Sequence, residues 1–364
     1  QAQLPRDPRR PPGAAQLGAK PMIMLRLAFA AALSAATAAA AQAPAKPLFA
    51  SDQPIRFTIT GPITDIARTA QSSRGPRAAT LSISGSPAET HPIQLSPRGI
   101  TRLKRETCQF PPLRVRFQGS PAPPSLFAGQ RQLKLVTHCR AQASFQQHLL
   151  LEYAAYRLYN LLTPASFRAR LATVDYVNDG NRPVTSRLGF FIEEIEDVAA
   201  RNGMRRAATG DRVATSQLSP TDAARIALFE YMIGNQDWSA RAGPPGEGCC
   251  HNSRLIAPGP GGSLIPVPYD FDYSGLVNPP YAVAPDGIRS VRERNYQGFC
   301  VHNAQALAVA AEFRARRGPM LAVLGHVPLD ESVRRRAAAY LDSFFADIAD
   351  DGRMAAKVLR GCTR

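Results

Sequence analysis

Two carboxylates stand two residues apart in the stretch PVPYDFDYSG, where Asp270 and Asp272 flank Phe271 between two tyrosines. In an extended strand, residues i and i+2 point to the same side, so the two carboxylates would share one face. Paired acids suit a divalent cation that carries phosphates, because Mg²⁺ is held by one or two carboxylates together with phosphate oxygens. The plain structural alternative is the solvent-facing edge of a half-buried strand.

Four more residues complete a set that phosphoryl transfer needs. That chemistry requires a cation for the phosphates, an acid that fixes this cation, a carboxylate that orients or deprotonates the acceptor, and metal ligands. In chain order the candidates are Lys134 in QLKLVTH, Glu152 in the next helical segment, Asp237 after YMIGN, and Asn252 in CCHN. Each also has a structural explanation, such as a surface ion pair or a turn. The order of the whole set favours the functional hypothesis.

The elements that must position these residues begin with a strand-rich first half. Between residues 45 and 140, short β-favouring runs alternate with Pro and Gly: IRFTIT, ATLSISG, HPIQL, PLRVRF and LKLVTH. The next segment, SFQQHLLLEYAAYRLYNLL, has helical spacing of apolar residues, with Ser144 as the expected N-cap and Pro164 beyond its end. RARLATVDYV and RLGFFIEEI predict two further strands.

The second half is predicted to be mainly helical. SPTDAARIALFEYMIG starts with a capping residue followed by proline and ends at Gly234. VHNAQALAVAAEFRARR and LDESVRRRAAAYLDSFFADIADD supply further helices. Between the helices, a loop and a hairpin are expected to carry GNQDW, HN and YDFD.

The order of these motifs resembles a group of exported bacterial proteins related to the spore-coat CotH kinase-like superfamily. The segments that carry the resemblance are SPRGITR, CQFPPLRVRF, LKLVTHC, LLLEYAAYRLYNLL, FEYMIGNQDWS, HN, VPYDFDYSGLVNPPY and GIRSVRERNYQGFC, from about Pro97 to the carboxy terminus. The resemblance implies an α+β, bilobal, protein-kinase-like fold. We expect a β-rich N-lobe with one central helix over residues 44–177 and a mostly helical C-lobe over residues 178–364.

The resemblance also implies ATP as phosphate donor and Mg²⁺ or Mn²⁺ as cofactor. By motif position, Lys134 would contact the nucleotide phosphates with Glu152 as its helix partner. Asp237 would be the catalytic-loop acid, and Asn252 and Asp270 would bind the metal. The expected function is an exported kinase-like phosphotransferase that acts on a protein or an envelope component.

Three departures from the family pattern keep an alternative open. Asp272 stands where related kinases have glycine, and which of the two paired acids is the main metal ligand is undecided. PRGITR has one glycine where phosphate-covering loops have several. Asp237 and Asn252 are fifteen residues apart, whereas kinase catalytic loops place these residues about five apart. The alternative is a disulfide-stapled pseudokinase that acts as a non-catalytic envelope binding protein, and a third interpretation is a structural calcium or zinc site.

The start of the chain has the pattern of a targeting sequence. Residues 24–43, MLRLAFAAALSAATAAAAQA, combine a basic residue, an apolar run and small residues, which is typical of a signal peptide. Residues 1–23 are rich in Pro and Arg and are interpreted as a non-native leader. The apolar run is short and alanine-rich for a membrane span, so no transmembrane span is expected after cleavage. The expected location is the periplasm or the outside of the cell.

Charge and cysteine content add two expectations. The chain has 44 Lys and Arg against 28 Asp and Glu, a net charge of +16, which attracts anionic partners such as nucleotides without choosing among them. It contains no nucleic-acid motif, so no specific nucleic acid is expected as a partner.

Six cysteines in an exported chain predict disulfides. We expect Cys108 to pair with Cys139 and Cys300 with Cys362, while the two cysteines of CCHN stay open, with zinc binding by CCHN and CVH as an alternative.

Overall fold

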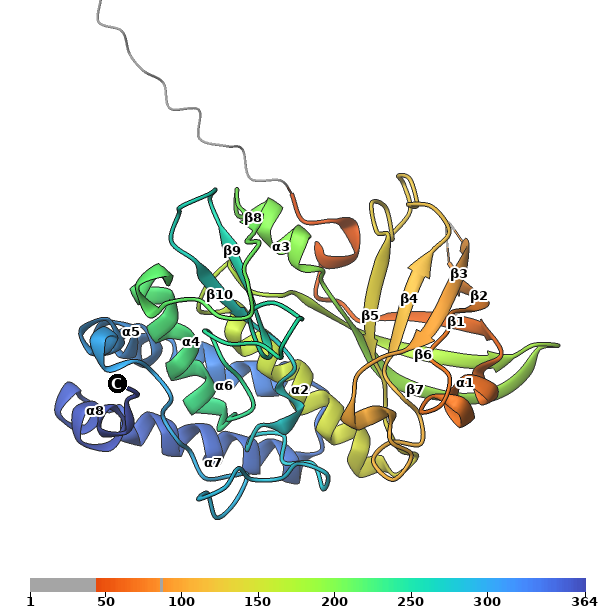
Figure 1. Cartoon of the computed structure of the whole chain (residues 1–364). Helices are drawn as coiled ribbons and strands as arrows, with labels where there is room; N and C mark the ends of the chain where they lie inside the picture. Colours follow the sequence, from red (N-terminus) through yellow and green to blue (C-terminus); the bar gives the residue numbers. More distant parts are fainter. Residues whose placement is uncertain (1–43, 86–87) are drawn as a thin grey trace, which may run out of the picture. The chain divides into compact units, whose positions relative to one another are not determined.

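The computed structural model describes residues 44–85 and 88–364, which belong to one compact unit. The expected leader (residues 1–23) and signal peptide (residues 24–43) lie outside the described residues. Within the described ranges the chain is a mixed α+β structure with a closed seven-stranded sheet, a three-stranded sheet and eight α-helices (Figure 1). The expected α+β class is therefore confirmed.

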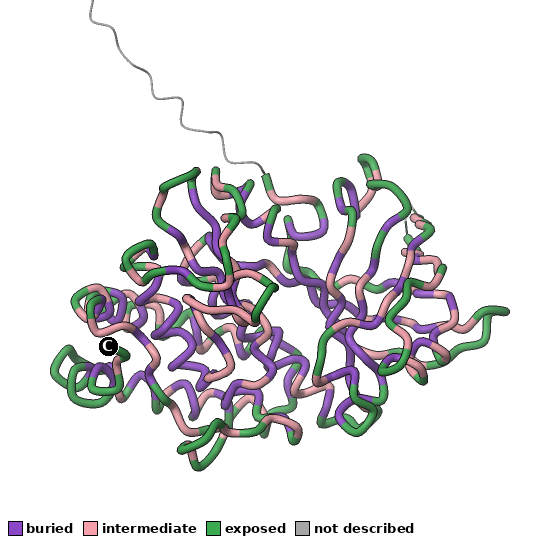
Figure 2. Tube along the Cα trace, viewed as in Figure 1, coloured by how far each residue is buried: buried purple, intermediate pink, exposed green. Residues whose placement is uncertain are grey.

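Seven strands close on themselves in the order β1-β2-β3-β4-β5-β7-β6. Their bounds are β1 Ile55–Gly61, β2 Arg77–Ile83, β3 Glu89–Pro97, β4 Leu113–Phe117, β5 Gln132–Val136, β6 Ala169–Asn178 and β7 Arg182–Ile192. Neighbouring strands are antiparallel except β1 and β6, which run parallel. The inward-facing side chains, among them Phe57, Leu81 and Ile93, fill a separate core. Figure 2 shows the buried stretches of the chain in this part of the molecule. All seven strand predictions are confirmed, and β7 continues the sheet past residue 177.

Helix α2, Ala143–Asn160, connects this sheet to the rest of the unit. It contacts β6 and β7 and also α6, Arg317–His326. Because it has neighbours on more than one face, Leu150, Ala154 and Tyr156 are all buried. The helix starts after Gln142, so the predicted N-cap at Ser144 is wrong and that residue lies in the first turn.

The second half is helical, as predicted. Helix α4 starts at its cap Ser219, whose Oγ accepts a hydrogen bond from the Asp222 backbone N–H. It ends at Gly234, which has φ of 66° and can adopt this left-handed conformation at no steric cost. The helices of this half are α4 Pro220–Ile233, α5 Asn303–Ala315, α6, α7 Glu331–Asp347 and α8 Asp351–Lys357. Helix α6 was not predicted, nor were the seven-residue helices α1 Ile63–Thr69, α3 Ile195–Arg201 and α8, which are too short to show helical periodicity.

A three-stranded antiparallel sheet, in the order β10-β9-β8, supports the candidate site. Its strands are β8 Arg205–Arg206, β9 Ser253–Ala257 and β10 Ile265–Pro268. The predicted hairpin is present as β9 and β10, but the strand interpretation of YDFD is wrong. Asp270 has φ of 65°, and Phe271–Tyr273 form one 3-10 turn. This turn buries Phe271 against the rings of Tyr156 and Phe229, which an extended strand with paired acids would not do.

Three disulfides include all six cysteines. The predicted pairs Cys108–Cys139 and Cys300–Cys362 are confirmed, and the adjacent Cys249 and Cys250 pair with each other. Zinc binding by these cysteines is contradicted, since zinc needs free thiolates. Three disulfides fit a protein that folds in an oxidising compartment.

The Cys300–Cys362 disulfide should contribute much of the stability of the helical part. It spans 62 residues, from the turn before α5 to the carboxy terminus. The double variant Cys300→Ser/Cys362→Ser should lose about 2 to 4 kcal/mol of unfolding free energy in urea, because the unfolded chain is no longer restrained by a long loop. Cys249→Ser/Cys250→Ser is the control, since a one-residue loop restrains little. Equal losses in the two variants, or free thiols at Cys300 and Cys362 in the wild type, would contradict this prediction.

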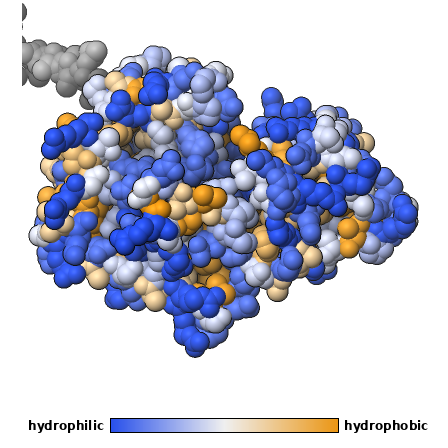
Figure 3. Space-filling model, turned by 60° about the horizontal axis from the view of Figure 1, so that its bottom comes forward, coloured by the Kyte–Doolittle hydropathy of each residue, from blue (hydrophilic) through white to orange (hydrophobic). Residues whose placement is uncertain are grey.

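The surface is largely hydrophilic. Figure 3 shows polar side chains over most of one face, with hydrophobic ones in small groups. Large exposed hydrophobic residues include Ile100, Val283 and Val301. Across the described ranges, every helix is too short or too polar to span a bilayer.

Candidate active site

A cavity of about 500 Å³ gathers five of the six residues that the sequence singled out. These are Lys134 from β5, Asp237 from the loop after α4, Asn252 before β9, and Asp270 and Asp272 after β10. The sixth, Glu152 of α2, lies at a smaller neighbouring cavity that also contacts Asp272. Tertiary structure therefore brings the whole predicted set to one region.

The walls of this cavity are more basic than acidic. Six cationic side chains line it, against four acidic ones. The cations are Arg74, Arg98, Arg102, Arg114, Lys134 and Arg254, and the acids are Asp237, Glu247, Asp270 and Asp272. Guanidinium groups bind phosphates through paired N–H donors, so this composition suits a ligand with several phosphates.

Lys134 faces the cavity without an acidic partner among the described residues. Strand pairing places it opposite Arg114, and its Nζ lies 5.5 Å from the ring centroids of both Phe167 and Tyr269. Burial lowers the pKa of Lys134 to about 8; the charge of Glu194 opposes this shift, and Arg98 and Arg114 reinforce it. The side chain is still mainly protonated at pH 7, so an anionic ligand would supply the missing counter-charge.

The expected partnership between Lys134 and Glu152 is not observed. Glu152 instead contacts Arg102, a buried residue of the 3-10 turn Thr101–Leu103 that the sequence analysis did not single out. The guanidinium lies 3.2 Å from Glu152, 2.8 Å from Asp270 and 3.3 Å from Asp272. Arg102 is the last residue of the quoted segment SPRGITR, but nothing local in the sequence indicates three acidic partners.

Arg102 does not balance the charge of its three acids. Burial raises the pKa of Glu152 to about 8, although Arg102 opposes the shift. Burial likewise raises the pKa of Asp272 to about 6. One guanidinium faces three carboxyl groups, so the cluster needs either a bound proton or an additional cation.

Two candidate metal ligands have left-handed backbones. Asn252 has φ of 48° and Asp270 has φ of 65°. Asn and Asp tolerate this region better than other side chains, but residues held there often belong to functional sites. The Asp270 backbone N–H donates to the Tyr156 hydroxyl at 3.0 Å, and the Asn252 carbonyl accepts from the Tyr269 N–H at 2.9 Å. These hydrogen bonds hold the backbone of Asn252 and of Asp270 at the cavity wall.

Asp237 is held by residues on both sides of the loop that follows it. One carboxylate oxygen lies 2.7 Å from His251 Nε2, and the other accepts from Asn252 Nδ2 at 3.0 Å. The Asn235 side chain accepts a hydrogen bond from the Asp237 N–H at 3.1 Å. The fifteen-residue spacing between Asp237 and Asn252 is thus no obstacle. The inserted loop folds back, with Asp211 accepting hydrogen bonds from its glycines.

The donor set fits a cation that arrives with phosphates rather than one enclosed by protein. No group of three or more His, Cys, Asp or Glu residues is arranged for a metal within residues 44–85 and 88–364. Mg²⁺ needs only one or two carboxylates when phosphates and waters complete its shell. Asp270, about one-third exposed, and Asn252 supply suitable oxygens. Arg102 contacts both acids, but Asp272 is more enclosed and also accepts a hydrogen bond from the Tyr281 hydroxyl at 3.0 Å.

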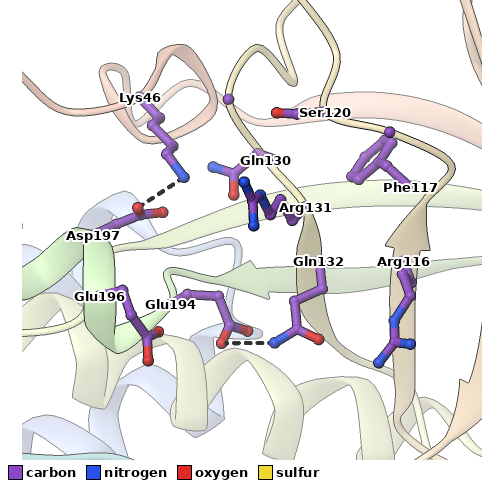
Figure 4. A pocket seen from close by; sticks show the side chains of 12 residues that line it. Lys46, Arg116, Phe117, Ser120, Gln130, Arg131, Gln132, Glu194, Glu196 and Asp197 are labelled. Carbon is purple, nitrogen blue, oxygen red and sulfur yellow. Dashed lines mark hydrogen bonds and ion pairs between the residues drawn. The ribbon is translucent and has the colours of Figure 1, made fainter. Parts of the chain in front are cut away.

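A second cavity, of about 820 Å³, lies farther along the same strands (Figure 4). Gln132 lines it and stands two residues before Lys134 on β5, so both side chains share one face of the sheet. The buried Gln130 has no hydrogen-bond partner for either amide atom among the described residues. Gln132 Nε2 donates to Glu194 at 3.4 Å. Within the described residues, the Gln130 amide is thus the group of this cavity that has no partner for its donor or its acceptor.

No protein-family model matches the chain, and curated proteins give no match either. The relationship to the CotH kinase-like proteins therefore stays a prediction based on the motifs.

Proposed function

We propose that the protein is an exported kinase-like phosphotransferase that uses ATP and Mg²⁺ or Mn²⁺ to phosphorylate a protein or an envelope component. The observation that supports this most strongly is the meeting of Lys134, Asp237, Asn252, Asp270 and Asp272 in one basic cavity. Their order in the chain is the order that the motif resemblance implies. Under this proposal the closed sheet and the helical part correspond to the two lobes of a kinase-like fold.

Each part of the cavity has a role in the proposed reaction. Lys134, Arg98 and Arg114 neutralise the phosphates of the nucleotide. Asn252 and Asp270 would hold the divalent cation, which supplies charge neutralisation at the transferred phosphoryl group. The nucleoside end would extend toward the second cavity, since its lining residue Gln132 stands two residues, about 7 Å, before Lys134 on β5.

The test is metal-dependent nucleotide binding by the oxidised protein, measured as a thermal shift. ATP with Mg²⁺ should raise the melting temperature, since a ligand that binds only the folded state stabilises it. Lys134→Met and Asp270→Asn should each weaken binding about tenfold or more, a loss of about 1.4 kcal/mol. Lys357→Met and Asp286→Asn change the same residue types on the exposed surface and should bind normally.

Two results would contradict this proposal in different ways. If the wild type binds no nucleotide with any divalent metal, the enzyme function fails. If it binds ATP but both cavity variants bind as tightly as the wild type, the nucleotide site lies elsewhere.

A pseudokinase is the second candidate. The observation that favours it is Arg102, whose guanidinium already contacts both Asp270 and Asp272. In that case the basic cavity would hold an anionic partner in the periplasm or outside the cell without turnover. Nucleotide binding without any phosphorylated product would support this alternative over the enzyme.

A further inference from the structure

A third cavity, of about 410 Å³, is formed by the stretch of chain that follows Asp237. The residues from Trp238 to Ala242 line it, whereas Asp237 itself lines the 500 Å³ cavity. Asp237 and Trp238 are consecutive, so the walls of the two cavities meet at this point of the chain. The proposed contacts of the nucleotide and the metal make no use of the third cavity.

The charged side chains that line the third cavity are both arginines, Arg212 and Arg241. Neither forms an ion pair with an acidic residue of the described ranges, and no acidic side chain of those ranges lines the cavity. The Arg241 guanidinium lies over the ring of Phe299, 5.5 Å from its centroid, and its buried Nε has no hydrogen-bond partner in the described part of the chain. The cavity therefore holds two positive charges that lack a counter-charge.

Backbone hydrogen bonds hold the two arginine-bearing segments together. The Arg241 carbonyl accepts from the Val213 N–H at 2.9 Å, and an isolated antiparallel bridge pairs Arg212 with Ala242. Ser239 Oγ accepts from the Arg241 N–H at 3.2 Å. A hollow lined by one sign of charge attracts counter-ions, and guanidinium groups bind carboxylates and phosphates through paired N–H donors. This arrangement suits an anionic group of a ligand.

The aromatic residues of the cavity limit the kind of ligand. Trp238 is only 7% exposed, and the Phe299 ring has Arg241 over it and the His302 ring beside it, 5.8 Å away. Neither ring offers an open face on which a sugar could stack. The small volume and the two arginines are better matched by one acidic side chain of a peptide than by an anionic glycan.

We propose that the cavity lined by Arg212 and Arg241 binds the carboxylate of an acidic residue in a protein acceptor; this rests on the proposed phosphotransferase function and names its substrate class. Arg241 follows Asp237 by four residues, so their Cα atoms are at most about 14 Å apart. An extended peptide covers that distance in about four residues. The acidic residue should therefore lie within about four residues of the hydroxyl that accepts the phosphate.

Trp238 gives a readout of binding that does not depend on turnover, because it is the single tryptophan of the chain and lines this cavity. The probes are synthetic peptides that contain one serine and one glutamate, placed at each of the four positions on either side of the serine. Matching peptides carry glutamine in place of glutamate. The best glutamate peptide should change the tryptophan emission saturably and bind about tenfold or more tightly than its glutamine counterpart, since hydrogen bonds to a charged group are the stronger ones.

Variants of the two arginines assign the effect to the cavity. Arg241→Met and Arg212→Met should each weaken binding of the glutamate peptide about tenfold. Both should keep the wild-type melping temperature and the ATP-induced thermal shift, because neither arginine has an acidic partner in the described ranges. Arg335→Met, which changes an exposed arginine of α7, is the matched control and should bind like the wild type. Arg212→Glu should reverse the preference, so that a lysine peptide binds more tightly than the glutamate peptide.

Several results would overturn this assignment. They are equal binding of glutamate and glutamine peptides, wild-type binding by both methionine variants, and binding of glucuronate as tight as that of the best peptide. The acceptor role is also overturned if the wild type binds ATP but transfers phosphate equally well to both kinds of peptide, or to neither. Absence of ATP binding in the wild type removes the proposed function and the acceptor role with it, whereas the tryptophan titration still decides whether the cavity binds carboxylates.

Discussion

Replacement of Asp237 by asparagine should lower phosphate transfer from ATP by about 10²- to 10⁴-fold. The carboxylate lies at the cavity wall between His251 and Asn252, where the acceptor hydroxyl must be oriented. An amide keeps the size of the side chain but carries no negative charge to stabilise a proton taken from the acceptor. Turnover is measured as phosphorylated product and released nucleoside diphosphate.

The same variant should bind ATP with Mg²⁺ nearly as well as the wild type. Asp237 contacts neither Lys134 nor Arg114, and the asparagine oxygen can still accept the hydrogen bond from the proposed metal ligand Asn252, so the nucleotide-induced thermal shift should persist. Asp286→Asn, on the exposed surface, controls for the loss of one negative charge. Full turnover in Asp237→Asn would remove this residue from the catalytic site, and loss of ATP binding would assign it to the nucleotide instead.

Replacement of Arg102 by methionine should destabilise the fold by about 3 to 5 kcal/mol near pH 8, because removing one partner of a buried ion pair leaves uncompensated charge. Glu152 and Asp272 are buried, and Asp270 is partly exposed. Urea unfolding at a series of pH values measures the effect. Arg105→Met, which changes a neighbouring exposed arginine, should have little effect.

The loss in Arg102→Met should depend on pH. The folded-state pKa values of Glu152 and Asp272 are already raised to about 8 and about 6, above the ordinary values of 4.5 and 3.8 for these side chains. Raised values mean that folding favours the protonated acids, so stability is present at low pH and is lost as pH rises through these values. Without Arg102 both pKa values rise further. The two folded proteins then differ in bound protons only where the wild-type acids ionise, so the penalty should set in near pH 6 and grow through pH 8.

A compensated variant separates charge from packing. Arg102→Met combined with Glu152→Gln and Asp272→Asn should recover part of the stability at pH 8, since neutral amides need no counter-charge. A penalty that is the same at pH 5 and pH 8, or that the two amides fail to reduce, would show that Arg102 contributes through packing alone.

The order of elements could be predicted from the sequence because it follows from local patterns. Strands in the first half showed as β-favouring runs between Pro and Gly, and α4 showed through Ser219 at one end and Gly234 at the other. The two long-range disulfides followed from an even number of cysteines beside predicted elements. Five of the six candidate residues share one cavity, so the order of residue types along the chain was informative about the site.

The contacts within the site could not be predicted, because they join residues that are far apart in sequence. Arg102 contacts Asp270 across 168 residues, and no local periodicity indicates which cation will meet which acid. The left-handed turn at Asp270 was missed because alternating aromatic and acidic residues also suit a strand. His251 was quoted only as part of a motif, and its pairing with Asp237 depends on how the inserted loop folds back.

The sequence alone thus determined which side chains are present, in what order, and which strands and long helices flank them. Tertiary structure decided which charged groups face one another. Arg102, and not Lys134, lies beside Glu152, and His251 lies beside Asp237. The physical reason is that propensity and capping act over a few neighbouring residues, whereas the pairing of buried charges depends on how the closed sheet, α2 and the β9–β10 hairpin pack together.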